Sequence, residues 1–307
     1  MSTPEFHDPR LTEQRNPRTH AIDVASSQEI VDLMNAEDRL VPDAVHACRE
    51  EIAHAVDLVV EAFRTGGRLV YVGAGTSGRL GVLDATECPP TFGTSPDMVV
   101  GIIAGGLPAL TRSQEGAEDD LAAAVHDLNA NAVSDRDVVL GIAASGTTPY
   151  VRAALDRARR VGARTALLTC SDPPQDLAGA CDVAIVVRAG PEVLTGSTRL
   201  KAGTATKVVL NTITTAAMIR LGKAYGNLMV DLMAWSEKLK DRGERIVMEA
   251  CRVDRERARR AIEEAGGSVK LAVVMVRRGV DRVAAKSLLE EAGGMVRRAA
   301  GNPPPVS

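Results

Sequence analysis

The chain has 307 residues and a formal net charge of −3, so it is long enough to bury a substantial core and has no bulk attraction to nucleic acid or to a membrane surface. Only 2% of the residues are aromatic. The core must therefore be built from Ala, Val, Leu and Ile, which favours helices packed on a parallel sheet.

Helical and strand patterns alternate along most of the chain. Residues 1–20 are polar and contain proline, which predicts an extended arm. Helical patterns occur at 27–37, 42–64, 121–128, 150–161 and 202–221. Five short apolar runs occur at 69–72, 98–103, 138–142, 165–169 and 183–187. This alternation predicts an α/β fold with a doubly wound, parallel five-stranded sheet and N-terminal helices.

From about residue 243 the strand pattern ends. Short helical patterns follow at 245–252, 255–265, 269–278 and 280–291. We therefore expect four parts: an arm at 1–20, the sheet domain with flanking helices at 21–242, a small C-terminal helical module at 243–300 and a tail at 301–307. The proline-rich stretch 302–305 is expected to be disordered.

The segment 73–79 reads GAGTSGR and joins the first apolar run to a helix. Glycine permits a sharp turn and close approach of backbone N–H groups to a ligand, and the helix points its partial positive end at the turn. Two hydroxyl groups lie in the same turn. The segment therefore predicts an anion-binding turn with these candidate residues: Gly75, Thr76, Ser77, Gly78 and Arg79.

The same glycines satisfy G-x-G-x-x-G, the pattern of dinucleotide sites. Such a site needs a carboxylate at the end of the next strand to hold the ribose. The run 98–103 ends instead in Ala104-Gly105-Gly106. Hydroxyl groups in the turn suit a phosphate monoester, so we favour a sugar phosphate over NAD.

A second hydroxyl-rich turn follows the run 138–142, and its candidate residues are Ser145, Gly146, Thr147 and Thr148. Ligands bind beyond the carboxyl ends of parallel strands, so both turns are expected to face one crevice. For this turn taken alone, Ser145 and Thr147 serving as helix N-caps is a competing interpretation.

A third segment, 195–204, precedes the long helix and carries Ser197, Arg199 and Lys201. Basic and hydroxyl side chains at this place are candidates to hold a phosphate or a carboxylate. An ordinary exposed loop is about as good an interpretation of this segment alone.

Two acidic segments are candidates for acid–base chemistry. Glu87 precedes Pro89-Pro90, which are expected to end the helix that starts at the anion-binding turn. A helix C-terminus disfavours negative charge, so we expect Glu87 to act as a general acid. Glu118 lies in the acidic run 115–120, which alone resembles an ordinary helix N-terminus; beside Glu87 it becomes a second acid or base.

The cysteines and histidines point to no further chemistry. The five cysteines have no C-x-x-C spacing and are expected to be reduced, with Cys88 a packing residue. The five histidines show no metal-ligand spacing, so we expect no metal. A polar N-terminus and the absence of an 18-residue apolar run predict a cytoplasmic protein with no membrane partner.

Taken together, the motifs resemble the N-acetylmuramic acid 6-phosphate etherase family from about residue 11 to 300. The matching segments are TEQRNP at 12–17, GAGTSGR at 73–79, ECPP at 87–90, EGAED at 115–119, AASGTTPY at 143–150, TGSTRLKAGT at 195–204 and GKAYGNLMVD at 222–231. The resemblance implies a SIS (sugar isomerase) fold and a homodimer.

The resemblance also implies an activity. Members of the family cleave the D-lactyl ether of N-acetylmuramic acid 6-phosphate to N-acetylglucosamine 6-phosphate and D-lactate, in the recycling of cell-wall amino sugars and without a cofactor. The sugar opens to its aldehyde, a base removes the C2 proton, lactate leaves from C3, and water adds. Glu87 falls on the family's proton donor and Glu118 on its second catalytic glutamate.

Three alternatives stay open at this point. An aldose–ketose isomerase on the same fold also removes a proton beside a carbonyl, but releases no lactate. A non-catalytic sugar-phosphate sensor has no need of an acid–base pair such as Glu87 and Glu118. An NAD-dependent enzyme is disfavoured by the missing carboxylate.

Overall fold

The computed structural model describes residues 8–232 and 237–305. The chain divides into two compact units, one of Met1–Thr86 with Pro96–Thr214 and one of Glu87–Ser95 with Thr215–Ser307. Two long helices, α4 (Gly75–Phe92) and α9 (Lys201–Arg220), contribute residues to both units. The second unit therefore begins inside α9, whereas the sequence pattern places the start of the helical module at 243.

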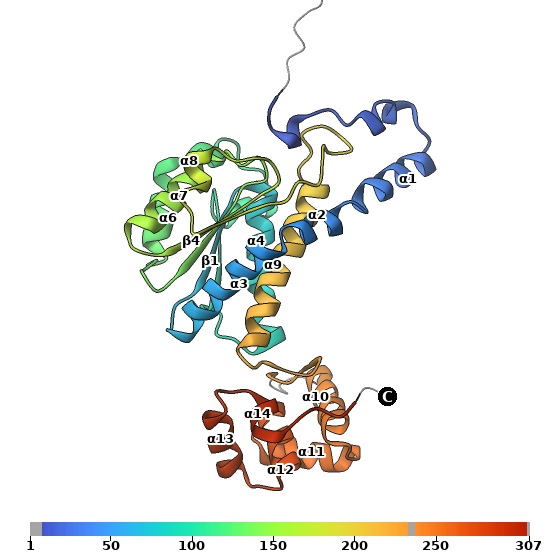
Figure 1. Ribbon diagram of the computed structural model, residues 1–307, viewed down its shortest axis with the longest axis vertical. Helices are drawn as coiled ribbons and strands as arrows, with labels where there is room; N and C mark the ends of the chain where they lie inside the picture. Colours follow the sequence, from blue (N-terminus) through green and yellow to red (C-terminus); the bar gives the residue numbers. More distant parts are fainter. Residues whose placement is uncertain (1–7, 233–236, 306–307) are drawn as a thin grey trace, which may run out of the picture. The chain divides into compact units, whose positions relative to one another are not determined.

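The first unit is built on a parallel sheet in the order β2-β1-β3-β4-β5 (Figure 1). Its strands are β1 (Leu69–Gly73), β2 (Val99–Ile103), β3 (Val138–Ile142), β4 (Arg164–Thr169) and β5 (Val183–Val186). All four pairings are parallel, and β1 and β3 are buried along their whole length. The predicted doubly wound five-stranded fold is confirmed.

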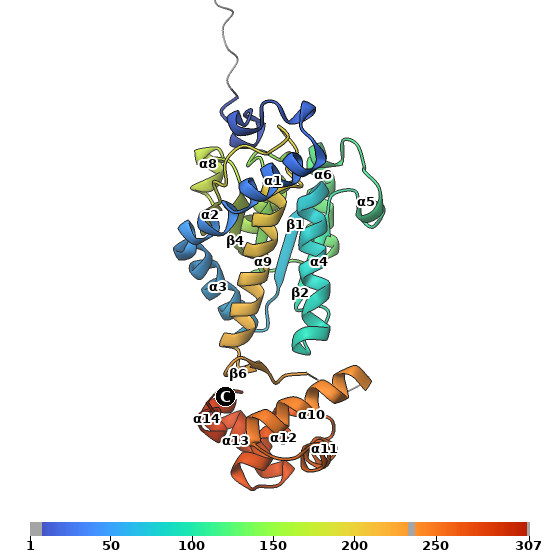
Figure 2. The ribbon, with the colours of Figure 1, turned by 90° about the vertical axis from the view of Figure 1, so that its right-hand side faces the viewer.

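Helices cover both faces of this sheet. One face packs on α6 (Leu121–Ala130) and α7 (Pro149–Arg160), with α8 (Gln175–Ala178) beyond them (Figure 1). The other face packs on α3 (Arg49–Arg64), α4 and α9 (Figure 2). A buried polar cluster joins this second layer: Tyr71 of β1 donates to Asp84 of α4 at 2.8 Å, and Asn211 of α9 donates to the same carboxylate at 2.6 Å.

The N-terminal segment is docked on the first unit and not extended as the sequence pattern predicts. It forms three 3-10 turns, η1 (Leu11–Glu13), η2 (Pro17–Thr19) and η3 (Ile22–Val24), before α1 (Ser27–Asp38). Thr12, Asn16 and Thr19 are buried. Thr19 Oγ1 donates to Val193 O at 2.8 Å, and Gly196 N donates to Thr12 O at 3.0 Å. Residues 1–7 of the expected arm lie outside the described residues.

Other boundaries differ in detail. The pattern at 42–64 forms two helices, α2 (Val41–Ala47) and α3, which meet at Cys48. Between β2 and α6 lie a four-residue helix, α5 (Pro108–Thr111), and a 3-10 turn, η4 (Ala117–Asp119).

The second unit is helical apart from a two-stranded hairpin. Its helices are α10 (Glu237–Cys251), α11 (Arg255–Glu264), α12 (Val269–Arg278), α13 (Arg282–Glu291) and α14 (Val296–Ala300). The hairpin joins β6 (Ala224–Tyr225) to β7 (Leu228–Met229) through Gly226-Asn227. A core of small and aliphatic side chains fills this unit.

The described part of the C-terminal tail is tied to the second unit, which corrects the expectation of disorder at 302–305. Tyr225 Oη donates to Gly301 O at 2.9 Å, and Arg277 Nη2 donates to Asn302 O at 2.7 Å. Pro303 and Pro304 line one groove together with Tyr225. Residues 306–307 lie outside the described part of the chain.

Candidate functional site

The topology of the sheet places the first two predicted turns side by side. β1 and β3 are neighbours, with Gly73 opposite Ile142 at their carboxyl ends. The chain leaves β1 through α4 toward β2 on one side and leaves β3 through α7 toward β4 on the other. The strand order therefore reverses between β1 and β3, which is where open α/β sheets bind ligands.

The turn after β1 is shaped by its glycines. Gly75 has φ of +54° and faces open space, so the backbone is accessible there. A methyl group on Gly78 would lie 2.6 Å from Gly73 O and 2.6 Å from Ile103 Cγ1, so helix and strand approach too closely for a side chain. Because α4 starts at Gly75, its first N–H groups have no partner within the helix and are free to meet an anion.

The turn after β3 also contains a glycine with positive φ and hydroxyl side chains. Gly146 has φ of +76°, and Ser145 Oγ lies 3.2 Å from Thr147 Oγ1. The N-cap of α7 is Thr148, with no side-chain capping hydrogen bond. Ser145 and Thr147 are therefore not the N-caps of this helix, and the competing interpretation of this turn is wrong.

The third segment lies beside the first turn, but the side chain of its Lys201 makes buried contacts within the protein. A methyl group on Gly203, in the first turn of α9, would lie 3.7 Å from Thr76 Cγ2. Ser197 is half-buried just before the helix. Lys201 is 0% exposed, and its Nζ donates to Glu37 Oε2 at 2.6 Å and to Ala189 O at 3.0 Å. The structure thus commits the Lys201 ammonium group to a buried ion pair.

Sequence reasoning missed the two buried carboxylates that bind Lys201 and the N-terminus of α9. Glu192 is 1% exposed and accepts the backbone N–H groups of Lys201 and Ala202, so it occupies the N-terminus of α9. Glu37 is 2% exposed and pairs with both Arg18 and Lys201. Neither glutamate stands in a recognisable motif, so no sequence signal separates them from surface glutamates.

The Glu37 ion pair gives the fold a pH dependence. The Arg18 guanidinium group beside Glu37, helped by Lys201, lowers the pKa of that carboxyl group to about 2. The unfolded value is about 4.3, so this group stabilises the fold fully above that pH and loses its contribution as the pH falls toward 2, by roughly 3 kcal/mol.

We expect Glu37→Gln to remove this acid-dependent part of the free energy of unfolding and to destabilise the protein by about 3–5 kcal/mol at pH 7, because Lys201 is left buried without its partner. Urea unfolding between pH 2 and 7 measures both effects. Glu50→Gln is the matched control, since the Glu50 side chain is 81% exposed. A Glu37→Gln curve parallel to the wild-type curve would contradict the assignment.

Glu118 shares a cavity with the glycine turn after β1. It lies on η4, immediately before the Asp120 N-cap of α6. The cavity has a volume of 160 Å³, and its lining residues are Ala74, Gly75, Arg79, Ala104, Ala109, Ser113, Gln114, Glu115, Gly116, Ala117 and Glu118. Sequence reasoning missed Ser113 and Gln114 as cavity residues. The one sequence feature that could have indicated them is their position directly before the acidic run 115–120.

Arg79 spans this cavity from α4 to the α5 segment. Its Nε donates to Leu110 O at 3.1 Å and its Nη2 to Arg112 O at 3.4 Å. Arg79 thus contacts the chain that leads to Glu118.

The position of Glu87 corrects the sequence argument about helix ends. α4 continues through Pro89 and Pro90 to Phe92, and Gly93 N donates to Pro89 O at 2.9 Å. Proline removes one donor, but the last turn survives because the carbonyl groups of the prolines still accept. Glu87 is exposed, lies before the end of the helix and is not among the residues lining the cavity of Glu118.

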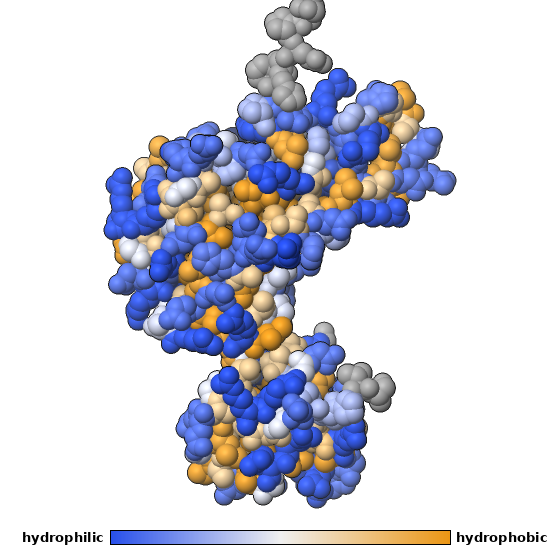
Figure 3. All heavy atoms as spheres, in the orientation of Figure 1, coloured by the Kyte–Doolittle hydropathy of each residue, from blue (hydrophilic) through white to orange (hydrophobic). Residues whose placement is uncertain are grey.

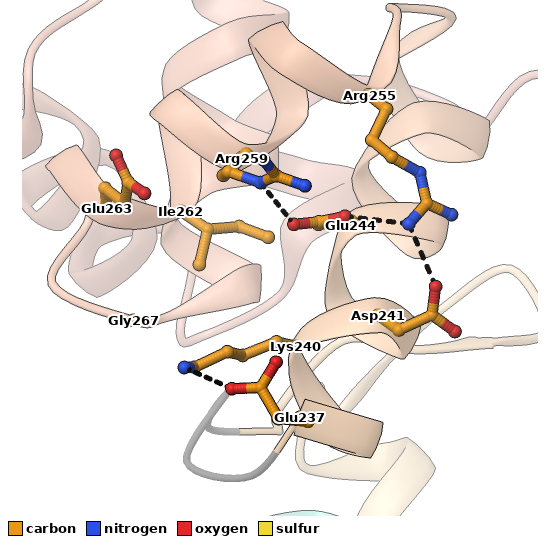
Figure 4. A pocket seen from close by; sticks show the side chains of 9 residues that line it. All are labelled: Glu237, Lys240, Asp241, Glu244, Arg255, Arg259, Ile262, Glu263 and Gly267. Carbon is orange, nitrogen blue, oxygen red and sulfur yellow. Dashed lines mark hydrogen bonds and ion pairs between the residues drawn. The ribbon is translucent and has the colours of Figure 1, made fainter.

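A larger cavity of 580 Å³ lies in the second unit, between α10, α11 and Gly267 (Figure 4). Its charged side chains are mostly paired with one another: Glu244 binds Arg255 and Arg259, and Lys240 binds Glu237. The motifs that predict a site lie elsewhere, so we assign this cavity no chemistry.

The described part of the chain holds no candidate metal site and no candidate membrane span. Within residues 8–232 and 237–305, no three His, Cys, Asp or Glu side chains are grouped so as to hold a metal ion. None of the described helices is long and apolar enough to cross a membrane. All five cysteines lie outside disulfide bonds, and Cys88 is buried as expected.

Comparison with known proteins decides the family. Residues 51–159 match the glucokinase regulatory protein N-terminal SIS domain, and residues 117–216 match the SIS domain. An N-acetylmuramic acid 6-phosphate etherase of Geobacillus thermodenitrificans is 55% identical over 267 residues, covering 87% of this chain and 90% of the relative. The chain belongs to the N-acetylmuramic acid 6-phosphate etherase family. The resemblance and the SIS fold predicted from the motifs are thereby confirmed.

A second relative matches over a similar share of the chain. An N-acetylmuramic acid 6-phosphate etherase 2 of Vibrio cholerae is 55% identical over 265 residues, which cover 86% of each chain. Among solved structures, a phosphoheptose isomerase from Neisseria gonorrhoeae matches with a TM-score of 0.49 at 18% identity, over 62% of this chain and 98% of that one.

Proposed function

We propose that the chain is a carbon–oxygen lyase that cleaves the D-lactyl ether of N-acetylmuramic acid 6-phosphate to N-acetylglucosamine 6-phosphate and D-lactate. The observation that carries the proposal is the shared cavity of Glu118 and the Gly75 turn, in a chain of this family. A carboxylate beside an anion-binding turn suits removal of a proton from a phosphorylated sugar.

The 6-phosphate group binds, in this proposal, at the two turns of the sheet. The donors are the hydroxyl groups of Thr76, Ser77, Ser145, Thr147 and Thr148, the N–H groups of the first turn from Gly75 to Ser77, and Ser197 at the edge. Gly78 and Gly146 shape the two turns, because their own N–H groups donate to Ala74 O at 3.3 Å and to Ala143 O at 2.8 Å. Lys201 leaves the predicted set because its ammonium group is buried against Glu37. The substrate is a small molecule, and the site has no role for nucleic acid, a membrane, a metal or NAD.

The reaction needs two carboxyl groups with different tasks. Opening of the sugar ring gives an aldehyde that acidifies the C2 proton. Glu118 removes that proton, and Glu87 gives a proton to the lactate oxygen as it leaves C3. Glu87, now charged, activates the water that adds to the unsaturated aldehyde.

Glu87 acts, in this proposal, in the site of a second copy of the chain. It lies twelve residues beyond Gly75 on α4, about 18 Å along the helix axis, which is longer than a hexose phosphate. Leu83, Thr86, Glu87 and Pro90 are exposed and share one face of α4. A face with Leu83 52% exposed suits burial against another subunit.

A homodimer is therefore part of the proposal. The apolar face of α3 packs against the sheet of its own subunit, so we look for the dimer surface elsewhere. Exposed apolar side chains occur on the N-terminal helical segment, where Figure 3 shows hydrophobic residues among hydrophilic ones; they include Val31 at 55% and Leu40 at 40%. These exposed groups and the α4 face are the surfaces we expect a dimer to cover.

The test is a lactate-release assay with N-acetylmuramic acid 6-phosphate and with the same sugar lacking phosphate. Lactate from the phosphorylated sugar alone supports the proposal. Isomerised sugar without lactate would favour an aldose–ketose isomerase. Tight binding with no turnover would favour a sensor, an alternative kept open by the match to a regulatory SIS domain.

Ser77→Ala is expected to raise KM with little change in kcat, because one hydrogen bond to a charged phosphate is lost, at a cost of roughly 1.5–3 kcal/mol. Steady-state kinetics on the phosphorylated sugar measure this change. Ser287→Ala, which removes an exposed serine hydroxyl group from α13 of the second unit, is the matched control. An unchanged KM would move the phosphate anchor away from this turn.

We place the enzyme in the cytoplasm. Five cysteines outside disulfide bonds suit a reducing compartment.

A further inference from the structure

We propose that Arg79 is a positioning residue: it fixes the segment 105–118, and with it Glu118, against the anion-binding turn, and does not bind the phosphate. This inference rests on the proposed function, because it assigns Arg79 a part in that reaction. It also replaces the sequence-based expectation that Arg79 belongs to the phosphate-binding set.

The hydrogen bonds of Arg79 go to backbone carbonyl groups. Nε donates to Leu110 O and Nη2 to Arg112 O, at the end of α5. The last carbonyl groups of a helix have no partner within it. Arg79 therefore caps α5 from a neighbouring helix and joins α4 to the segment.

This segment has little else to hold it. Among residues 105–118 only Ala109 is buried, and Leu107 is 81% exposed. Gly105, Gly106 and Gly116 have positive φ, so the backbone turns repeatedly. With so little packing, two hydrogen bonds from a charged donor are a large part of what fixes the segment.

The segment in turn places Glu118. A methyl group on Gly105 would lie 3.1 Å from Gln114 Cβ, so the start of the segment approaches Gln114, four residues before Glu118. Ala117 N donates to Gln114 O at 3.4 Å, which starts the turn that carries Glu118. Arg79 and Glu118 line the same cavity. A shift of the α5 end is therefore passed to the carboxylate.

Arg79→Lys separates the two roles. Lysine keeps the positive charge but is a single point donor, so it does not bridge two diverging carbonyl groups as the guanidinium fork does. We expect kcat for lactate release to fall about 10- to 100-fold with little change in KM, because the base is misplaced and the phosphate anchor is intact. Arg112→Ala is the control, since Arg112 contributes its backbone carbonyl group to this contact.

Two further measurements report on the mobility of the segment 105–118 and on ligand binding. Amide hydrogen exchange in Arg79→Lys is expected to accelerate within 105–118 and to stay unchanged in the sheet, which also shows that the variant folds. The inhibition constants of inorganic phosphate and of D-lactate are expected to stay unchanged. Arg79→Gln is a second variant, which removes the positive charge and keeps a single amide nitrogen as hydrogen-bond donor.

The outcomes are distinguishable. A weaker inhibition by phosphate would make Arg79 a phosphate ligand, and a weaker inhibition by D-lactate would make it the partner of the lactyl carboxylate; either result overturns the positioning role. Unchanged exchange in 105–118 would overturn it as well. Failure of the wild-type enzyme to release lactate would instead overturn the proposed function, while the exchange result would still report on the contact.

Discussion

Glu118→Gln is expected to abolish both lactate release and exchange of the sugar C2 hydrogen with deuterated water, whereas Glu87→Gln is expected to abolish lactate release alone. Removal of the C2 proton by Glu118 is reversible and needs no leaving group. Departure of lactate needs the proton that Glu87 supplies. Each lost acid or base is expected to lower the rate about 10²–10⁴-fold.

Lactate assays and the deuterium content of the recovered sugar measure the two steps separately. Asp119→Asn is the matched control, because Asp119 is a neighbouring exposed carboxylate that does not line the cavity of Glu118. If Glu87→Gln lost exchange while Glu118→Gln kept it, the roles would be reversed. If both variants kept lactate release, neither carboxylate would be part of the reaction.

An equal mixture of Glu87→Gln and Glu118→Gln chains, unfolded and refolded together, is expected to regain roughly a quarter of the wild-type activity. About half of the dimers then carry one of each chain, and each such dimer has one site with both carboxylates intact. The gain over either variant alone is about 25- to 2,500-fold, because each variant alone keeps about 10⁻² to 10⁻⁴ of the wild-type rate.

Refolding Glu118→Gln with Glu118→Ala is the control, because no dimer in that mixture has an intact Glu118. Light scattering checks that the chains associate, and a mass of 32.4 kDa would show monomers and contradict the dimer. Mixed dimers that stay inactive would show that Glu87 serves its own chain.

The sheet was predictable because its signals are local. Each strand is a short run of apolar residues buried on both faces, as β1 and β3 are, so the pattern alone gives their limits to within a residue. The sharp turn after β1 was predictable for the same reason, because glycine suits the positive φ at position 75 and the close approach of position 78 to Gly73.

Two of the errors concern groups whose partners are distant in the sequence. Lys201 is predicted as a phosphate ligand from its neighbours, but its partner is Glu37, which lies 164 residues away. The proline-rich tail is predicted as disordered, but Tyr225 and Arg277 hold it. Local pattern contains none of this tertiary information. The error at Pro89-Pro90 is of another kind: α4 keeps its last turn through a local hydrogen bond from Gly93 N to Pro89 O.

The most direct test of the central claim, elimination followed by addition of water, is the reaction run in water enriched in ¹⁸O and deuterium. The ether bond breaks between C3 and oxygen, so lactate keeps the ether oxygen and the sugar takes its new C3 hydroxyl group from water. We predict ¹⁸O at C3 and deuterium at C2 of the N-acetylglucosamine 6-phosphate, and no ¹⁸O in the ether-derived hydroxyl group of lactate. Label in that lactate hydroxyl group, or a C2 position without deuterium, would contradict the proposed mechanism.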